Sequence, residues 1–198
     1  MKIFAFVDLH GNLSALRHIV ERAGKSDIDF VVNAGDLTVF GDKLNFIANE
    51  LAKTKKLTIM IPYNHETDEE IFKICQRHPN FVYLQRRWLR KRNYLFMGYG
   101  GGGFGFTDKR FEKVADKFKK LIKKGDKVIL ISHAPPYGTK TDKIGREHCG
   151  NKSIRHFIEH HKPDLVICGH LHECAGKEDR IGKTRIVNPG PKGIVIEI

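Results

Sequence analysis

Residues 2–12 read Lys-Ile-Phe-Ala-Phe-Val-Asp-Leu-His-Gly-Asn, a short apolar run that stops at a carboxylate and an imidazole. Residues 2–7 are rich in Ile, Phe and Val, which is typical of a strand buried on both faces of a parallel sheet. Ligands of open α/β sheets lie beyond the carboxyl ends of the strands. Because side chains alternate along an extended chain, we expect Asp8 and His10 to face one cation together. Asp-x-His alone is a weak motif, and a turn carboxylate beside a surface histidine is its simpler interpretation.

The same pattern, a buried strand that ends in polar residues, recurs down the chain. We expect further strands at residues 29–33, 57–61, 127–131 and 165–168, and helices at 13–23, 43–52, 67–75 and 153–161. The polar residues at the strand ends are Asp36, Asn64, His65, His133, His170 and His172. Successive strand–helix units bring their strand ends to one edge of a sheet, so we expect these residues to share a site.

The middle of the chain has a different character. Residues 81–84, 87–90 and 94–97 are expected to be short strands in meander order, which suggests a second sheet. The glycine-rich residues 98–105 lack the strand–helix context and the Lys-Ser/Thr pair of a P-loop, so we expect a loop that either passes close to a bulky group or is mobile.

Two lysine-rich or polar segments follow. Residues 117–127 are expected to form a helix with Phe118, Leu121 and Ile122 inward and lysines in solvent. Residues 137–150 are polar and are expected to form a surface loop that overhangs the site.

Length and composition bound the class of protein. With 198 residues, 40% of them hydrophobic, we expect a single domain over residues 1–198. The first apolar run is broken by Asp8, unlike a signal peptide, and no run reaches the length of a membrane span, so we expect a cytoplasmic protein without a membrane partner. The four cysteines form no Cys-x-x-Cys pair, which argues against a zinc ribbon or a disulfide framework.

The chain is basic, with a net charge of +12. Such a charge favours phosphate-bearing partners, from small nucleotides to nucleic acid. Residues 86–92 hold five basic side chains and the only tryptophan. This stretch is suited to a phosphate backbone, but an exposed hairpin explains it equally well.

Taken together, the motifs resemble those of the calcineurin-like metallophosphoesterase superfamily, in the order that the family uses: Asp8-x-His10, Gly35-Asp36, Asn64-His65-Glu66, His133 and Gly169-His170-x-His172. The chain is similar to the small, cap-less phosphodiesterase-like members of prokaryotes. The resemblance implies an α/β fold, a four-layer α/β/β/α sandwich of two mixed sheets with a dimetal site at the carboxyl ends of the strands. It also implies that Asp8, His10 and His172 hold one ion, that Asn64, His133 and His170 hold the other, that Asp36 bridges them, and that the catalytic His65 stands beside the leaving group.

The donor types agree with such a centre. Mixed carboxylate and imidazole ligands suit Mn, Fe, Ni, Zn or Co better than Mg or Ca. Two divalent ions can share a hydroxide that attacks phosphorus in line. Their four positive charges exceed those removed by Asp8, Asp36 and the hydroxide, so the centre stays electropositive toward phosphate.

Two departures from the family pattern bear on the substrate. Protein Ser/Thr phosphatases of the family continue Gly-Asp with x-x-Asp-Arg-Gly, whereas residues 37–41 here read Leu-Thr-Val-Phe-Gly. The phosphate-gripping arginine is missing, which argues against a protein phosphatase. The family glycine before Asn-His is Tyr63 here, which would wall the pocket, stack on a base or only fill space. We expect substrate contacts from Tyr63, Tyr99 and Phe104.

The expected function is a metal-dependent phosphodiesterase acting on a small, nucleotide-like substrate. One alternative is a nuclease, suggested by the basic charge and residues 86–92. Another is a non-catalytic, metal-binding scaffold of the same fold, which the full set of ligands argues against. The sequence carries no indication of the oligomeric state.

Overall fold

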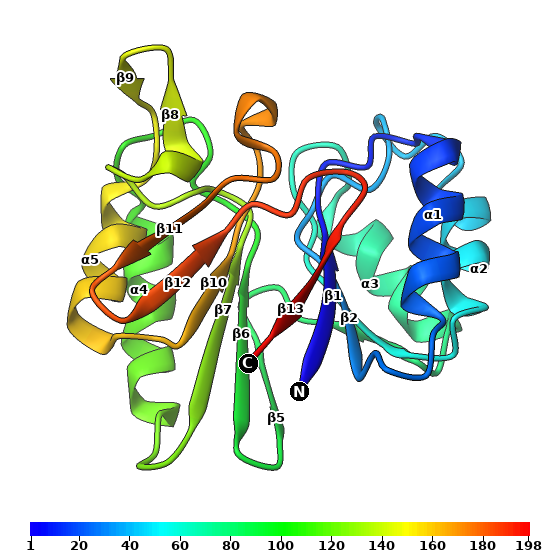
Figure 1. Cartoon of the computed structure of the whole chain (residues 1–198), viewed down its shortest axis with the longest axis horizontal. Helices are drawn as coiled ribbons and strands as arrows, with labels where there is room; N and C mark the ends of the chain where they lie inside the picture. Colours follow the sequence, from blue (N-terminus) through cyan, green and yellow to red (C-terminus); the bar gives the residue numbers. More distant parts are fainter.

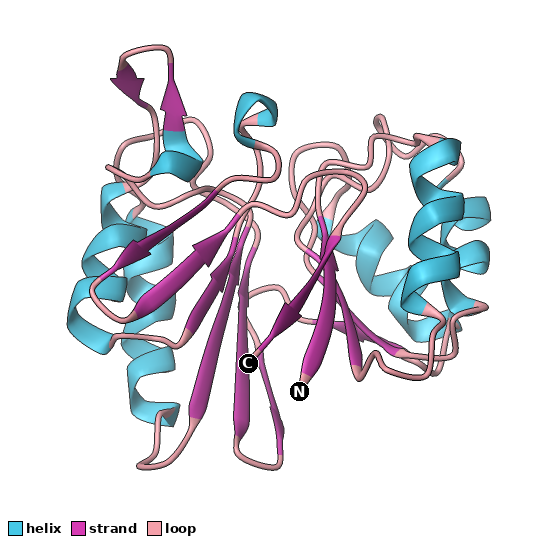
Figure 2. Ribbon diagram, viewed as in Figure 1, coloured by secondary structure: helices cyan, strands magenta, loops and turns pink.

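Two β-sheets face each other at the centre of the molecule, and helices cover their outer faces (Figures 1 and 2). The computed structural model describes residues 1–198. The layers run helices, sheet, sheet, helices, which confirms the predicted α/β/β/α sandwich of two mixed sheets.

The first sheet has the strand order β13-β1-β2-β3-β4. Its strands are β1 (Lys2–Phe6), β2 (Phe30–Asn33), β3 (Leu57–Met60), β4 (Phe81–Tyr83) and β13 (Ile194–Glu197). The first four are parallel, and β13 pairs antiparallel with β1. The crossover helices α1 (Leu13–Ala23), α2 (Leu44–Ala52) and α3 (Asp68–Arg77) cover its outer face.

The prediction that residues 81–84 belong to a second sheet is wrong. β4 pairs in parallel with β3, through Thr58↔Phe81 and Met60↔Tyr83, so it extends the first sheet. The chain returns from α3 to the same sheet, as a third strand–helix–strand unit. A three-residue strand carries too little side-chain alternation to show which sheet it joins.

The second sheet has the strand order β11-β12-β10-β7-β6-β5. Its strands are β5 (Trp88–Lys91), β6 (Tyr94–Tyr99), β7 (Lys127–Ser132), β10 (Leu165–Ile167), β11 (Glu178–Ile181) and β12 (Thr184–Val187). The four inner strands are parallel and the two edge strands are antiparallel to their neighbours. Helices α4 (Lys109–Phe118) and α5 (Lys152–His161) cover its outer face. Residues 137–150 contain a short hairpin, β8 (Lys143–Ile144) and β9 (Glu147–His148), that projects above this sheet in Figure 1.

The lysine-rich helix starts earlier than predicted. Asp108 caps α4 by accepting hydrogen bonds from the N–H groups of Arg110 and Phe111, and the helix ends at Phe118. A single 3₁₀ turn over Lys119–Leu121 replaces the helix expected at 117–127. The prediction placed the helix too far toward the C-terminus because it followed the run of lysines. The helix start is determined instead by the Asp108 cap and the buried Phe111.

Three apolar cores explain why the strands read as uninterrupted apolar runs. In β1, Phe4 and Phe6 pack toward α1 and α2, while Ile3 and Ala5 pack into the core between the sheets. A third core lies between the second sheet and the helices α4 and α5. Strands buried on both faces need apolar side chains at every position. No helix in the chain has the length and apolar character needed to cross a membrane.

Candidate metal centre

The loops that follow the parallel strands of both sheets gather at one end of the molecule, at the top of Figure 1. These loops carry the predicted ligands, called here the candidate metal residues: Asp8, His10, Asp36, Asn64, His133, His170 and His172. They come from the ends of β1, β2 and β3 in the first sheet and of β7 and β10 in the second. The site therefore lies where the two sheets meet.

Three overlapping groups of side chains converge there. The ligand atoms of Asp8, His10 and His172 all lie within 4.8 Å of one another, as do those of Asp8, Asp36 and His133. A third group joins His10 and Asp36 to His65. Because the groups share members, they form one continuous set of carboxylates and imidazoles.

The two remaining candidate metal residues lie at the border of this set. His170 donates its backbone N–H to Asp8 Oδ2 at 3.0 Å, and its ring lies edge-on to that of His133, with centroids 5.4 Å apart. Asn64 is exposed in the turn between β3 and α3, directly before His65. His170 does not belong to the three converging groups.

The backbone at these residues is unusual. Four of them have left-handed φ values: Asp8 at 54°, His10 at 44°, Asp36 at 51° and His170 at 72°. Residues other than glycine rarely adopt this conformation, and such strain clusters at functional sites. The prediction of an extended chain at residues 8–10 is thus wrong, because a turn and not the pleat brings Asp8 and His10 together.

Two glycines give the candidate ligands room. A Cβ on Gly35 would lie 2.5 Å from His133 Nδ1. A Cβ on Gly169 would lie 2.2 Å from Val7 Cγ2 and 3.0 Å from Asp8 Oδ2. Both positions therefore require glycine for the close approach of the backbone to the site.

His133 is fully buried and is oriented by its backbone surroundings. Its Nδ1 donates to the carbonyl oxygen of Ala34 at 2.9 Å, which leaves the Nε2 lone pair free. Nε2 lies 3.7 Å from Asp8 Oδ1 and 3.5 Å from Asp36 Oδ2, too far for a hydrogen bond.

Several buried polar atoms of the site have no hydrogen-bond partner. They are Asp8 Oδ1, His65 Nδ1 and His133 Nε2. Buried polar atoms nearly always have partners, and an orphaned one is costly. Cations bound beside Asp8 Oδ1 and His133 Nε2 would satisfy both atoms, so these residues fit the dimetal centre that the resemblance implies.

The electrostatics point the same way. Burial, and then the charge of Asp36, raises the pKa of Asp8 to about 7, and burial raises the pKa of Asp36 to about 7. Burial also lowers the pKa of His133 well below its usual value and, with the neighbouring imidazoles, lowers that of His10. Burial therefore disfavours the charged forms of Asp8, Asp36, His10 and His133, and a cation would stabilise the two carboxylates.

The three residues that we expected to contact substrate lie in three different environments. Tyr63 stacks on His133, with ring centroids 3.8 Å apart and planes at 21°. Phe104 is 85% exposed and meets the ring of His170 edge-on at 4.8 Å. Tyr99 is buried, and its hydroxyl donates to Asp108 Oδ2 at 2.6 Å. The expected substrate contact is therefore wrong for Tyr99, because the alternation in β6 turns its ring into the helix-covered core.

Two residues near the candidate metal residues were not predicted from the sequence. Phe40, 77% exposed, lies against the ring of His65 with centroids 4.5 Å apart. Glu66 is buried, and its Oε1 accepts hydrogen bonds from the backbone N–H and the hydroxyl of Thr38 at 2.5 and 2.6 Å. Glu66 thereby ties the loop after β3 to the loop after β2. Its place in Asn64-His65-Glu66 was the available signal.

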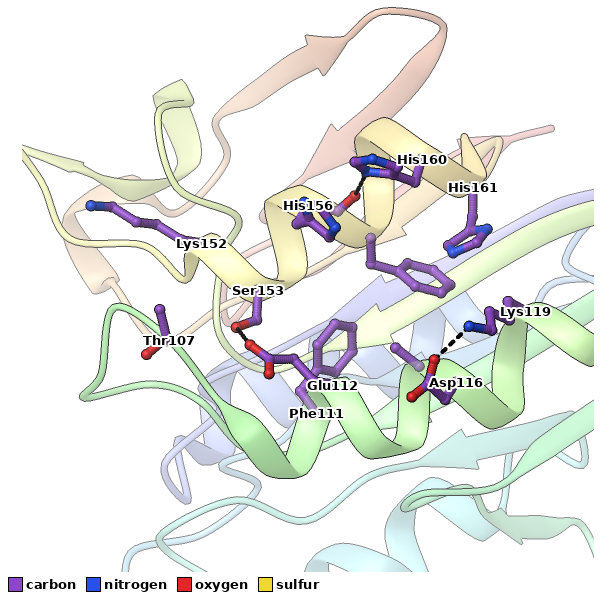
Figure 3. Close-up of a pocket in the computed structure, with 12 residues that line it drawn as sticks. Thr107, Phe111, Glu112, Asp116, Lys119, Lys152, Ser153, His156, His160 and His161 are labelled. Atoms are coloured by element: carbon purple, nitrogen blue, oxygen red, sulfur yellow. Dashed lines mark hydrogen bonds and ion pairs between the residues drawn. The ribbon is translucent and has the colours of Figure 1, made fainter.

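A cavity of about 650 Å³ lies between α4 and α5, outside the candidate metal residues (Figure 3). Three histidines of α5, His156, His160 and His161, line it opposite two acidic residues of α4. Those acids already have partners, since Glu112 accepts from Ser153 and Asp116 pairs with Lys119. None of these side chains belongs to a converging group of metal-binding type.

Comparison with known proteins agrees with this geometry. A sequence profile of the calcineurin-like phosphoesterase family matches residues 1–174. The chain therefore belongs to the calcineurin-like phosphoesterases, a family that uses dimetal centres.

Individual relatives extend over the whole chain. An uncharacterized protein of Methanocaldococcus jannaschii is 32% identical over 99% of this chain and 91% of its own length. The crystal structure of a Thermus thermophilus protein superposes with a TM-score of 0.75 at 21% identity, covering 96% of this chain and 89% of that one. A dimetal phosphatase from Danio rerio has a TM-score of 0.71 at 13% identity, covering 94% and 86%. These two likenesses show the fold.

Proposed function

We propose that the protein is a metal-dependent phosphodiesterase that hydrolyses a small, nucleotide-like phosphodiester. The observation that carries the proposal is the convergence of two buried carboxylates with several imidazoles, in which Asp8 Oδ1, His65 Nδ1 and His133 Nε2 are buried without hydrogen-bond partners. Two divalent transition-metal ions bound there would polarise a phosphoryl group and lower the pKa of water. The family membership supports phosphoester hydrolysis in general, and the choice of a diester is our inference.

The chain's own residues would divide the work by position. Asp36 would bridge the two ions, as the family resemblance implies, and it belongs to one converging group with His133 and to another with His10. Asp8 also belongs to two groups, one with His10 and His172 and one with Asp36 and His133. Asp8, His10 and His172 would hold one ion, and His133, His170 and Asn64 the other. The hydrogen bond from His133 Nδ1 to Ala34 O favours the tautomer whose Nε2 would be free to bind a metal ion.

His65 would act on the leaving group. Its backbone N–H lies 3.4 Å from Asp36 Oδ1, and its Nδ1 is buried without a partner. A free imidazole nitrogen at this position can hold a proton for the departing ester oxygen. Its nearness to His10 and Asp36 also fits a ligand role, so metal binding and turnover have to be measured separately.

The surroundings favour a diester over a monoester. A phosphate monoester carries about −1.5 to −2 charges, which arginine forks commonly bind. No arginine forms an ion pair with a candidate metal residue. Phe40 occupies the position at which the family's protein phosphatases place their phosphate-gripping arginine. A singly charged diester with organic substituents suits such a rim better.

The basic stretch at residues 86–92 gives the nuclease alternative little support. Arg86 and Arg90 are paired with Asp68 and Asp126. The hairpin turns at Arg92, at the other end of β6 from the strand end that adjoins His133. The patch therefore extends away from the candidate metal residues.

The test uses metal-stripped protein reloaded with Mn, Fe, Ni, Zn, Co or Mg. We expect bis(p-nitrophenyl) phosphate to be cleaved faster than p-nitrophenyl phosphate, and a transition metal to be more effective than Mg. Asp36→Asn should lose both metal and turnover, whereas His65→Ala should keep two ions and lose turnover. His156→Ala, a histidine variant outside the site, is the control. Protein that binds two ions and cleaves neither ester would support the scaffold alternative instead.

A further inference from the structure

A second cavity, of about 300 Å³, opens directly beside His170. It is lined by Gly103, Phe104, Gly105, Phe106, Cys149, His170 and Leu171. These residues come from the glycine-rich loop (residues 100–105) with the adjoining Phe106, from the end of the segment 137–150, and from the loop after β10. The volume is at the lower end of the range of small-molecule sites, about 300–1,000 Å³.

The walls of this cavity are apolar although they adjoin a polar centre. Phe104 is 85% exposed and Phe106 is 56% exposed. Phe106 continues into an edge-on contact with Tyr137, with centroids 6.1 Å apart. Grouped exposure of large apolar side chains is informative, because it marks surfaces that a ligand or a partner covers.

Hydrogen bonds hold the loop that carries Phe104 in place, so the exposure of this ring is not caused by a loosely held loop. Asn151, buried at the start of α5, donates its side-chain amide to the carbonyls of Gly102 and Gly105, at 3.1 and 2.9 Å. The N–H of Lys152 donates to Phe106 O at 2.6 Å. The exposed rings are therefore preorganised, which lowers the entropic cost of binding a ligand.

A cationic group completes the surface. The ammonium of Lys152 lies over the rings of Phe106 and Tyr137, 5.3 and 4.8 Å from their centroids. The outer end of the aromatic surface therefore carries positive charge and hydrogen-bond donors, while the inner end meets the metal-side imidazole of His170. A flat ring with polar edges matches this combination of aromatic faces and one cation.

We propose that Phe104 and Phe106 are specificity-determining residues that bind the base of a nucleoside ester, with its phosphate on the candidate metal residues. This inference rests on the proposed function and names the substituent that its diester carries. Phe104 and His170 lie on the side of the centre served by the second sheet, whereas Phe40 and His65 lie on the first-sheet side. The base is therefore on the ester group that the product retains, and the leaving group faces His65.

The first experiment measures binding without turnover, by calorimetry on Mn-loaded protein. Adenosine 5′-monophosphate and ribose 5-phosphate share the sugar and the phosphate and differ only in the base. Stacking of one base on aromatic side chains should make the nucleotide bind roughly tenfold or more tightly. We expect Phe104→Ala and Phe106→Ala to remove most of this ratio, and Phe104→Tyr to retain it. Phe46→Ala, which removes a half-exposed phenylalanine of α2 outside the cavity, should leave the ratio unchanged.

The second experiment compares thymidine 5′-(p-nitrophenyl phosphate) with methyl p-nitrophenyl phosphate, which release the same leaving group. We expect a higher kcat/KM for the nucleoside ester, lost in the same two alanine variants. Equal binding of nucleotide and sugar phosphate, or a base preference that survives both variants, overturns the inference. Turnover of both diesters without a base preference overturns it while the proposed function stands. A base preference that depends on Phe104 in a protein that cleaves neither ester supports it while the proposed function fails.

Discussion

The ring of Tyr63 lies flat against the ring of His133, with centroids 3.8 Å apart and an angle of 21° between the planes. The other contacts of Tyr63 hold it there, since a Cβ on Gly103 would lie only 1.8 Å from the Tyr63 hydroxyl. Tyr63 therefore occupies the space between a candidate ligand and the glycine-rich loop. One face of the Tyr63 ring is covered by His133. We therefore expect Tyr63 to stabilise the position of His133 more than to form an open wall of a substrate pocket.

We expect Tyr63→Gly, which introduces the glycine found at this position in the family motif, to weaken metal binding. Aromatic pairs contribute about 0.5–1.5 kcal/mol beyond their burial, which corresponds to roughly a two- to tenfold loss of affinity. Tyr63→Phe keeps the stacked ring and should stay near the unmodified protein. Titration of metal-stripped protein with Mn measures both. A Phe variant as weak as the Gly variant would show that the hydroxyl, and not the ring, supports the site.

The positions of the candidate metal residues could be predicted from the sequence because each follows a buried strand. The local conformation could not. Asp8 and His10 were predicted together for the wrong reason, since their left-handed φ values depend on contacts with distant chain segments. Asp8 N–H bonds to Gly35 O, and His10 N–H bonds to Asp36 O. Such long-range hydrogen bonds leave no periodic trace in residues 8–10.

The errors in the predicted fold have the same origin. β4 and α4 were misplaced because the sheet of a three-residue strand and the start of a lysine-rich helix are set by tertiary packing. Phe40 was missed as a neighbour of His65 because 25 residues separate them in the chain and no pattern links them. The spacing of the motifs therefore predicted the family, which the family comparison confirms, and only the three-dimensional structure shows which aromatic side chains lie around the candidate metal residues.

Metal affinity should depend on pH through Asp8 and Asp36. Burial raises the pKa of each to about 7, so below pH 7 the bare site holds protons that a cation must displace. We expect Mn affinity to fall by about tenfold or more per pH unit between pH 7 and pH 5.5, and to level off above pH 7.5. Calorimetry in buffers of different ionisation enthalpy should show proton release on binding at pH 6.5. Affinity that is flat between pH 5.5 and 7.5 would contradict raised pKa values at the ligands.

The same burial predicts the stability of the metal-free protein. For a carboxyl group with a raised folded-state pKa, the stabilising contribution is complete below the unfolded value of 3.8 and is lost as the pH rises through about 7. Metal-free Asp8→Asn, which cannot ionise, should therefore melt several degrees higher than the unmodified metal-free protein at pH 8. The difference should vanish near pH 4. An Asp8→Asn protein that melts lower at pH 8 would show that the carboxylate is well solvated or paired.

Substitution of Gly169 would test the close packing between the loop after β10 and Val7. A Cβ at this position would lie 2.2 Å from Val7 Cγ2, so Gly169→Ala should destabilise the protein by about 1–3 kcal/mol through overpacking. Val7→Ala removes the clashing methyl groups, and the double variant should recover part of that loss relative to Val7→Ala alone. Urea unfolding of the four proteins in this cycle gives the coupling energy. Strictly additive effects would mean that the backbone after β10 moves away instead of meeting Val7.

Asn151 links the helix start of α5 to the loop that carries Phe104, and its two ends can be tested apart. Its Oδ1 accepts from the N–H of Ile154, while its Nδ2 donates to Gly102 and Gly105. Asn151→Asp keeps the helix cap and replaces the two donated bonds with repulsion between a carboxylate and the loop carbonyls. We expect faster hydrogen exchange in residues 100–106 with little change in α5. Asn151→Ala removes both functions, and the loss of the cap alone costs about 1 kcal/mol. If exchange in the loop is unchanged in Asn151→Asp, then the packing of Gly103 on Tyr63, and not Asn151, holds Phe104 in position.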